Sequence, residues 1–145
     1  MDRPIVAYFS LTGVTEGVAR RLSEAIDGEL YEIRGEKAET AGEAVPKFVC
    51  DCQNLKGRNP IYVGLPVWWY AAPNAINEFL ESYDLRGKTV VPFVTSGAAN
   101  LDVLWRSLYA SCPGADLKKA SFLSDSLTGS ELADWASKAA ESEIL

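Results

Sequence analysis

The chain has 145 residues and no histidine, which excludes Ser-His-Asp and Cys-His nucleophile systems and histidine-ligated zinc. Lys and Arg total 14 against 20 Asp and Glu, a formal net charge of −6. This acidic balance excludes the basic surfaces that bind nucleic-acid phosphates or anionic membranes.

Apolar runs and amphipathic segments alternate along the chain, so strands and helices are expected in turn. Runs rich in β-branched and aromatic residues predict five strands, at 4–9, 29–33, 61–65, 89–95 and 120–123. Apolar residues at helical spacing predict helices over 14–26, over 73–82, over 101–108 and after a capping box at 128–131. Residues 34–59 show no clean period, and a short helix within 41–55 is expected there.

Strands that alternate with helices predict an α/β fold, a five-stranded parallel sheet with helices on both faces. Residues 1–145 are expected to form a single domain of this kind. In the strand order 2-1-3-4-5, the first, third and fourth strands are neighbours. Their carboxyl ends then meet at one edge, where open α/β sheets bind ligands.

The loop after the first strand reads Ser10-Leu11-Thr12-Gly13-Val14-Thr15. Its hydroxyls, together with the free N–H groups at a helix start, form an anion site, and Gly13 allows the backbone to turn. No Lys or Arg lies in the loop, so neutral donors would hold the anion. The alternative is an ordinary helix N-cap, where Ser and Thr are common.

The loop after the third strand carries three consecutive aromatic residues, Trp68-Trp69-Tyr70, between Pro66 and Pro73. Adjacent side chains point in different directions, so the three rings cannot all enter the core. The segment predicts a stacking surface for a flat aromatic ligand. The alternatives are a protein–protein contact or a plug of the core.

The loop after the fourth strand reads Thr95-Ser96-Gly97-Ala98-Ala99-Asn100. Its small residues permit close approach of backbone N–H and C=O groups to the edge of a ligand. The alternative is a plain strand-to-helix turn with Asn100 as the N-cap.

These three loops, in this order and spacing, resemble the flavodoxin family. Its phosphate loop is rich in hydroxyls and ends in Gly-x-Thr at the start of the first helix, as residues 13–15 do. A branch of the family carries Pro-[hydrophobic]-Trp-Trp and then Ala-Pro, which residues 66–69 and 72–73 match. The same branch has Pro-Phe-x-Thr-Ser-Gly at the fourth strand, which residues 92–97 match. The resemblance also accounts for Pro92, which is otherwise awkward inside a central strand.

The resemblance implies a three-layer flavodoxin-like fold that binds one FMN. It implies that residues 10–15 hold the phosphate, 66–70 hold the ribityl chain and isoalloxazine, and 95–98 line the pyrimidine side. The implied cofactor-binding residues are Ser10, Leu11, Thr12, Gly13, Val14, Thr15, Pro66, Val67, Trp68, Trp69, Tyr70, Thr95, Ser96, Gly97 and Ala98.

The function that the resemblance implies is electron transfer at low potential, with redox partner proteins docking near the flavin. The alternatives are a small FMN-dependent NAD(P)H or quinone oxidoreductase, and a domain that kept the fold and lost the flavin. A charge of −6 disfavours the anionic reduced flavin and favours docking to basic partners. Because flavin supplies the chemistry, no catalytic side chain is expected.

The remaining features have plainer interpretations. The sparse cysteines Cys50, Cys52 and Cys112, together with the lack of a leader sequence, predict reduced thiols in a cytoplasmic protein and no metal site. Trp105 and Trp135 fall at helical spacing with leucines and indicate core positions. Residues 118–119, two lysines, indicate a solvent-facing strand edge.

Overall fold

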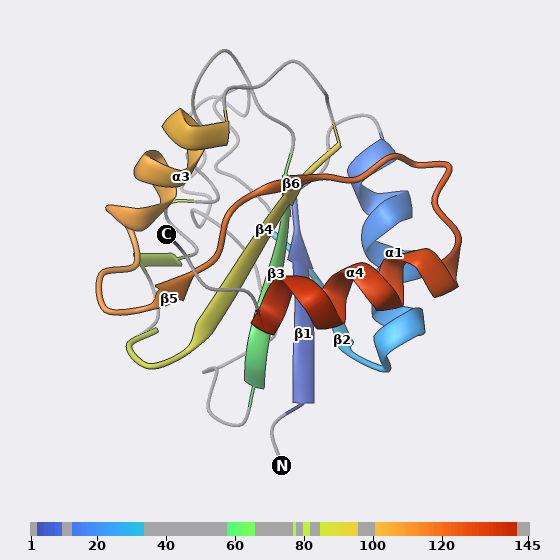
Figure 1. Ribbon diagram of the computed structural model, residues 1–145, viewed down its shortest axis with the longest axis horizontal. Coiled ribbons are helices and arrows are strands. Elements are labelled where there is room, and N and C mark those ends of the chain that lie inside the picture. Colours follow the sequence, from blue (N-terminus) through green and yellow to red (C-terminus); the bar gives the residue numbers. More distant parts are fainter. Residues whose placement is uncertain are drawn as a thin grey trace, which may run out of the picture.

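The computed structural model describes residues 3–9, 13–33, 58–65, 77, 80–81, 85–95 and 101–141. The strands are β1 (Arg3–Tyr8), β2 (Glu29–Glu32), β3 (Arg58–Leu65), β4 (Thr89–Val94), β5 (Asp116–Leu117) and β6 (Ser121–Phe122), as Figure 1 shows. The helices with defined bounds are α1 (Val14–Ile26), α3 (Leu101–Tyr109) and α4 (Gly129–Glu141). Residues 77, 80 and 81 are also helical, within the helix predicted over 73–82.

The strands of the described sheet pair in parallel, in the order β2-β1-β3-β4-β5, with β6 also beside β4. β5 pairs with the start of β4, at Thr89 and Val90, and β6 pairs with its end, at Phe93 and Val94. The two short strands therefore share the fifth position of the sheet. The predicted α/β fold with strand order 2-1-3-4-5 is confirmed.

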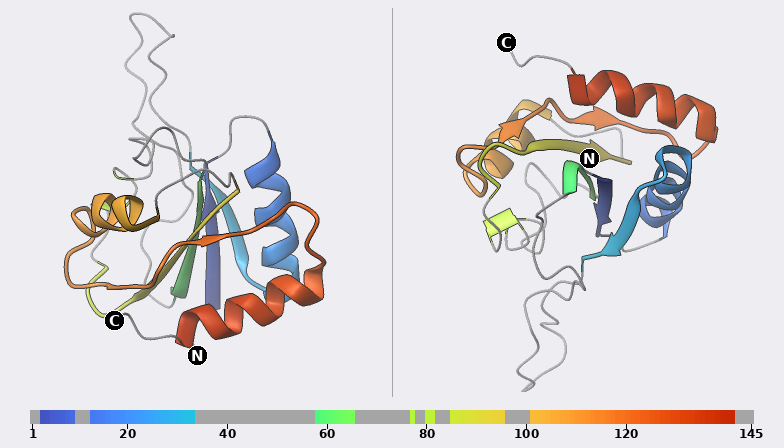
Figure 2. Two further views of the ribbon diagram at one scale, coloured as in Figure 1. Left: turned by 45° about the horizontal axis from the view of Figure 1, so that its top comes forward. Right: turned by 90° about the horizontal axis from the view of Figure 1, so that it is seen from below.

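Alternation along the strands sends side chains into two separate cores, one on each face of the sheet. On one face, Ile5 and Ala7 of β1 pack with Leu104 and Leu108 of α3. On the other face, the intervening β1 residues join a core built with α1 and α4, which contact each other (Figure 1 and Figure 2). The layers are helix, sheet and helix.

Pro92 lies inside β4, and the interrupted fifth strand explains why the sheet tolerates it. The carbonyls of Val90 and Val94 accept hydrogen bonds from the N–H groups of Lys118 and Leu123, so these two residues face the fifth strand. Pro92 has the same orientation, because backbone groups alternate in direction along a strand. Its missing N–H therefore faces the break between β5 and β6, where no continuous ladder needs it.

The same break corrects two expectations from the sequence. The strand predicted over 120–123 is shorter, and β5 precedes it as a separate strand. Lys118 was expected to face solvent but is only 5% exposed, whereas Lys119 is exposed. The Lys118 ammonium lies 2.9 Å from the Asp116 carboxylate, so its apolar stem is buried while its charge is paired.

The two tryptophans predicted as core lie at the margins of the cores. Trp105 packs beside the α3 core, and its Nε1–H donates to the Leu117 carbonyl at 3.0 Å. Trp135 packs beside the other core. None of the helices described is long and apolar enough to cross a membrane.

Candidate functional site

The segments that follow β1 and β4 meet at the carboxyl edge of the sheet. Thr15, in the first turn of α1, and Thr95, immediately after β4, have Oγ1 atoms 2.8 Å apart. Thr15 is 3% exposed, and Thr95 is half-buried. Since β3 lies between β1 and β4, this hydrogen bond joins the first and third predicted loops across a whole strand. The expectation that these two loops converge is met at these two residues.

The backbone at the start of α1 carries N–H groups that the helix itself does not bond. Gly13 is the N-cap, with φ 93° and ψ −9°, a left-handed conformation that favours glycine. It supplies no side-chain cap, and the first helical hydrogen bond runs from the Gly17 N–H to the Gly13 carbonyl at 3.0 Å. The N–H groups of residues 14–16 therefore have no acceptor within the helix.

The N-cap position of α1 is occupied by Gly13 and not by a Ser or Thr, which differs from the ordinary N-cap alternative. The nearest described hydroxyl, that of Thr15, bonds to Thr95 and does not cap its own helix. Val14 beside it is 38% exposed, an apolar side chain at the rim of the edge. The start of α1 thus combines N–H groups that have no acceptor within the helix, a left-handed glycine and a positive dipole end, a combination suited to an anion.

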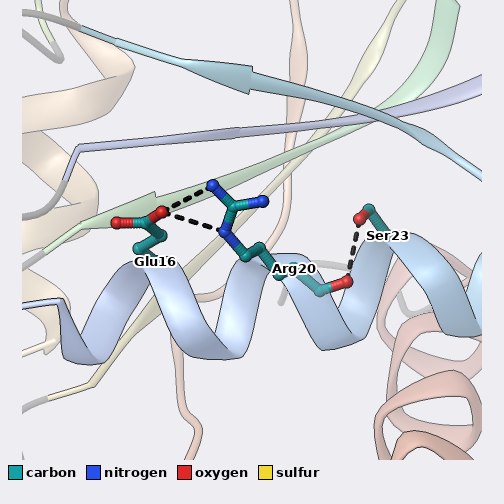
Figure 3. Close-up of polar contacts among 3 residues, drawn as sticks. All are labelled: Glu16, Arg20 and Ser23. Atoms are coloured by element: carbon teal, nitrogen blue, oxygen red, sulfur yellow. Dashed lines mark hydrogen bonds and ion pairs between the residues drawn. The ribbon is translucent and has the colours of Figure 1, made fainter.

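A charged pair flanks this helix start. Glu16, in the first turn of α1, accepts hydrogen bonds from Arg20 Nε at 2.9 Å and Arg20 Nη2 at 2.7 Å (Figure 3). The hydrogen bond and charge of Glu16, with smaller contributions from Tyr8 and Glu32, raise the pKa of Arg20 above its ordinary value. The Arg20 guanidinium offsets the charge of the Glu16 carboxylate, which would otherwise repel an anion at the start of α1.

The Arg20 side chain is the feature that the sequence analysis missed. Residues 10–15 themselves contain no Lys or Arg. The cation comes from the next turn of the helix, where a Glu and an Arg four residues apart are neighbours. The i,i+4 spacing was the available signal.

Beneath the site, the ends of β3 and β4 are held by close packing. Gly64 and Phe93 are register partners, and a Cβ on Gly64 would overlap the Phe93 ring. Phe93 in turn meets Trp135 of α4 edge-on, with ring centroids 5.9 Å apart. The N–H of Phe9 donates to the Gly64 carbonyl at 2.9 Å, which ties the end of β1 to the same point.

Tyr62 adds a polar anchor to this packing. Its hydroxyl donates to the Ala136 carbonyl at 3.0 Å, so β3 is bonded to α4. Burial raises the pKa of Tyr62 to about 12, and the phenol stays neutral and able to donate. The strands that lead to the site therefore rest on a well-anchored core.

All the other predicted site residues lie outside the described part of the chain. These residues are Ser10, Leu11, Thr12, Pro66, Val67, Trp68, Trp69, Tyr70, Ser96, Gly97 and Ala98. Cys50, Cys52 and the helix expected within 41–55 also lie outside it. Cys112 is a free, buried thiol whose pKa burial raises to about 11, which makes it a poor nucleophile.

A model of the flavodoxin family matches residues 3–45 and 40–139, and the chain belongs to that family. Among solved structures, a candidate flavoprotein from Bacteroides uniformis ATCC 8492 is 33% identical, with a TM-score of 0.78, and the match covers 94% of this chain and 99% of that one. One from Bacteroides eggerthii DSM 20697 is 28% identical, with a TM-score of 0.79 and coverage of 98% and 100%.

A more distant structure is the flavoprotein from Lactobacillus acidophilus NCFM, described in complex with FMN. It is 20% identical, with a TM-score of 0.70, and the match covers 94% of this chain and 99% of that one. At this identity the likeness establishes the fold. Among curated proteins, none matches the chain.

Proposed function

We propose that this protein binds FMN at the carboxyl edge of its sheet and transfers electrons at low potential. The observation that carries the proposal is the Thr15–Thr95 hydrogen bond, which brings the start of α1 and the end of β4 together at the edge where α/β sheets bind ligands. Membership of the flavodoxin family supports FMN as the cofactor, and so does the FMN complex of the Lactobacillus acidophilus neighbour.

The described residues fit a phosphate group. The N–H groups of residues 14–16 and the Thr15 hydroxyl are neutral donors that would hold it, and Gly13 lets the backbone come close. Arg20 compensates Glu16, the acidic residue of the first turn. We propose that Ser10, Leu11 and Thr12 complete this cradle.

The other parts of the flavin site stay predictions. We propose that residues 66–70 hold the ribityl chain and the ring, with Trp68 or Trp69 against the isoalloxazine. We propose that residues 95–98 line the pyrimidine side. Assignment to the Trp-Trp branch of the family rests on the same sequence motifs.

Bound FMN supplies the redox chemistry, accepting and releasing electrons. The chain supplies binding and charge, and its net charge of −6 opposes a further negative charge on the reduced flavin. The same charge favours basic surfaces on a reductase or acceptor protein as docking partners. A cytoplasmic location also belongs to this proposal.

One absorption experiment tests the cofactor, and a second test separates carrier from enzyme. Purified protein, stripped and refolded with FMN, should take up one flavin and turn yellow. A colourless product would overturn the proposal. In stopped-flow mixing, a carrier should bleach slowly with NADPH alone and rapidly when a reductase is added. Rapid bleaching by NADPH alone would favour the oxidoreductase alternative.

A further inference from the structure

The hydrogen bond between Thr15 and Thr95 can run in either direction, and its direction becomes important once a phosphate is bound. Each hydroxyl carries one hydrogen and two acceptor lone pairs, so only one member of the pair donates to the other. The 2.8 Å separation between the Oγ1 atoms allows either direction. The direction is therefore set by what else the two hydroxyls contact.

We propose that FMN fixes this direction, with Thr95 donating to Thr15 and Thr15 donating to the phosphate. The inference rests on the proposed function. A phosphate dianion only accepts hydrogen bonds, so Thr15 can bind it only by giving its single hydrogen. If Thr15 donated to Thr95 instead, its lone pairs would face the negative phosphate oxygens. Thr95 is thus a positioning residue for the phosphate, in addition to its predicted place on the pyrimidine side.

Because Thr15 is buried, its hydroxyl depends on Thr95 for a hydrogen bond from the protein. With 3% of Thr15 exposed, water has little access to its hydroxyl, and the described partner is Thr95. A hydroxyl that accepts a hydrogen bond becomes a stronger donor, because bonds in a chain polarise one another. The donation from Thr95 should therefore strengthen the contact between Thr15 and the phosphate.

The backbone under Thr95 is held firmly enough for this role. Phe93 and Val94 just before it pair with β3 on one side and β6 on the other. The Val94 carbonyl also accepts from the Leu123 N–H at 2.8 Å. A donor carried at the end of a paired central strand is preorganised, so little ordering is needed when the ligand arrives.

The test compares FMN with riboflavin, which has the same ring and no phosphate. In Thr95→Val, which keeps the shape and loses the hydroxyl, FMN should bind about three- to tenfold more weakly, as expected for one hydrogen bond. Riboflavin affinity should fall by a smaller factor than FMN affinity, because a contact of Thr95 with the ring affects both flavins and only FMN carries the phosphate. Thr95→Ser should retain wild-type FMN affinity. Thr89→Val, half-buried at the opposite end of β4, is the matched control and should leave both affinities unchanged.

A second readout separates positioning from general structure. The 31P resonance of bound FMN should move in Thr95→Val and stay in place in Thr95→Ser. Thr15→Val combined with Thr95→Val should bind FMN no more weakly than Thr15→Val alone, since Thr95 acts through Thr15. If Thr95→Val folds poorly, Thr95→Ala provides the same comparison.

Three results would overturn the inference. The first is equal weakening of FMN and riboflavin in Thr95→Val, which indicates a role at the ring alone or in folding. The second is unchanged FMN affinity in that variant. The third is a fully additive double variant. Absence of FMN binding by the wild-type protein is a different failure, because it overturns the proposed function itself.

Discussion

The Phe93 ring lies directly over Gly64, its register partner on the neighbouring strand β3. The space that a Cβ would occupy on Gly64 is already taken by the ring edge. Both residues are buried, and both lie near the strand ends that lead to the predicted flavin loops. A single hydrogen at this position thus allows the aromatic packing under the site.

Gly64→Ala should therefore lower the free energy of unfolding by about 2–3 kcal/mol, the usual cost of overpacking a core. Urea denaturation measures this change. Adding Phe93→Leu should recover part of the loss, because the smaller side chain makes room for the methyl group. A Gly64→Ala protein as stable as wild type would contradict the close packing.

The two glycines at the start of α1 should respond in opposite directions to alanine. Gly13 has φ 93°, so Gly13→Ala should cost about 1–2 kcal/mol of stability. Gly17 lies within the helix, and no described atom is within 4 Å of a Cβ built on it. Gly17→Ala should therefore stabilise the protein by about 0.5–1 kcal/mol. Thermal or urea unfolding measures the stability of both variants. Equal changes in the free energy of unfolding would contradict the assignment of Gly13 as the N-cap.

The Glu16–Arg20 pair should tune FMN affinity through charge. Arg20→Gln should weaken FMN binding about two- to fivefold at low ionic strength, and Glu16→Gln should strengthen it, because charges near a helix start act on a bound anion. Both effects should shrink at high salt. Riboflavin binding should stay unchanged in both variants.

The matched control for this pair lies on α4. Asp134 and Lys138 form an exposed i,i+4 pair, 3.1 Å between charged atoms, on a different helix. Lys138→Gln alters the net charge by the same amount and should leave FMN affinity nearly unchanged. Equal weakening by Arg20→Gln and Lys138→Gln would show that overall charge, and not position, is responsible.

The buried Tyr62 phenol and Cys112 thiol should make the stability of the fold fall at high pH. Burial raises the pKa of Tyr62 from 10.0 to about 12 and that of Cys112 from 9.0 to about 11. The unfolded chain releases these protons at lower pH than the folded chain, so their contribution to stability is complete below about pH 9 and is lost as pH rises toward 12.

Tyr62→Phe isolates the titration of the phenol. At neutral pH it should cost about 1 kcal/mol, because the Ala136 carbonyl loses its donor. Between pH 9 and 12 its stability should fall less steeply than that of wild type, so the two curves approach each other. Denaturant melts across this range supply the data, with Cys112→Ala as the companion variant. Parallel curves for Tyr62→Phe and wild type would count against the burial of the phenol.

The sequence predicts this fold well where local chemistry and tertiary structure agree. The capping box is one case: the Thr128 N–H donates to Glu131 Oε1 at 2.8 Å, and the Glu131 N–H donates to Thr128 Oγ1 at 3.1 Å. Reciprocal caps of this kind depend on residues three apart, so a short motif is sufficient to predict them.

Features that depend on distant partners were harder to predict. Lys118 is charged and looks solvent-facing in the sequence, but the break in the fifth strand and the nearby Asp116 allow it to be buried. Pro92 looks incompatible with a central strand until the same break is known. The candidate site contains one feature with a local sequence signal and one that depends on a distant residue. The motif at 10–15 indicated an anion site, whereas the Thr15–Thr95 bond joins residues 80 positions apart and has no local signal.

In the proposed site, the start of α1 holds the phosphate of FMN. Titration of FMN into the apoprotein, followed by the loss of flavin fluorescence, tests it directly when wild type and Thr15→Val are compared with both FMN and riboflavin. Wild type should bind one FMN, and Thr15→Val should lose FMN affinity by about tenfold or more while retaining riboflavin binding. Saturable FMN binding that is equally strong in Thr15→Val, or no binding by wild type, would contradict the claim.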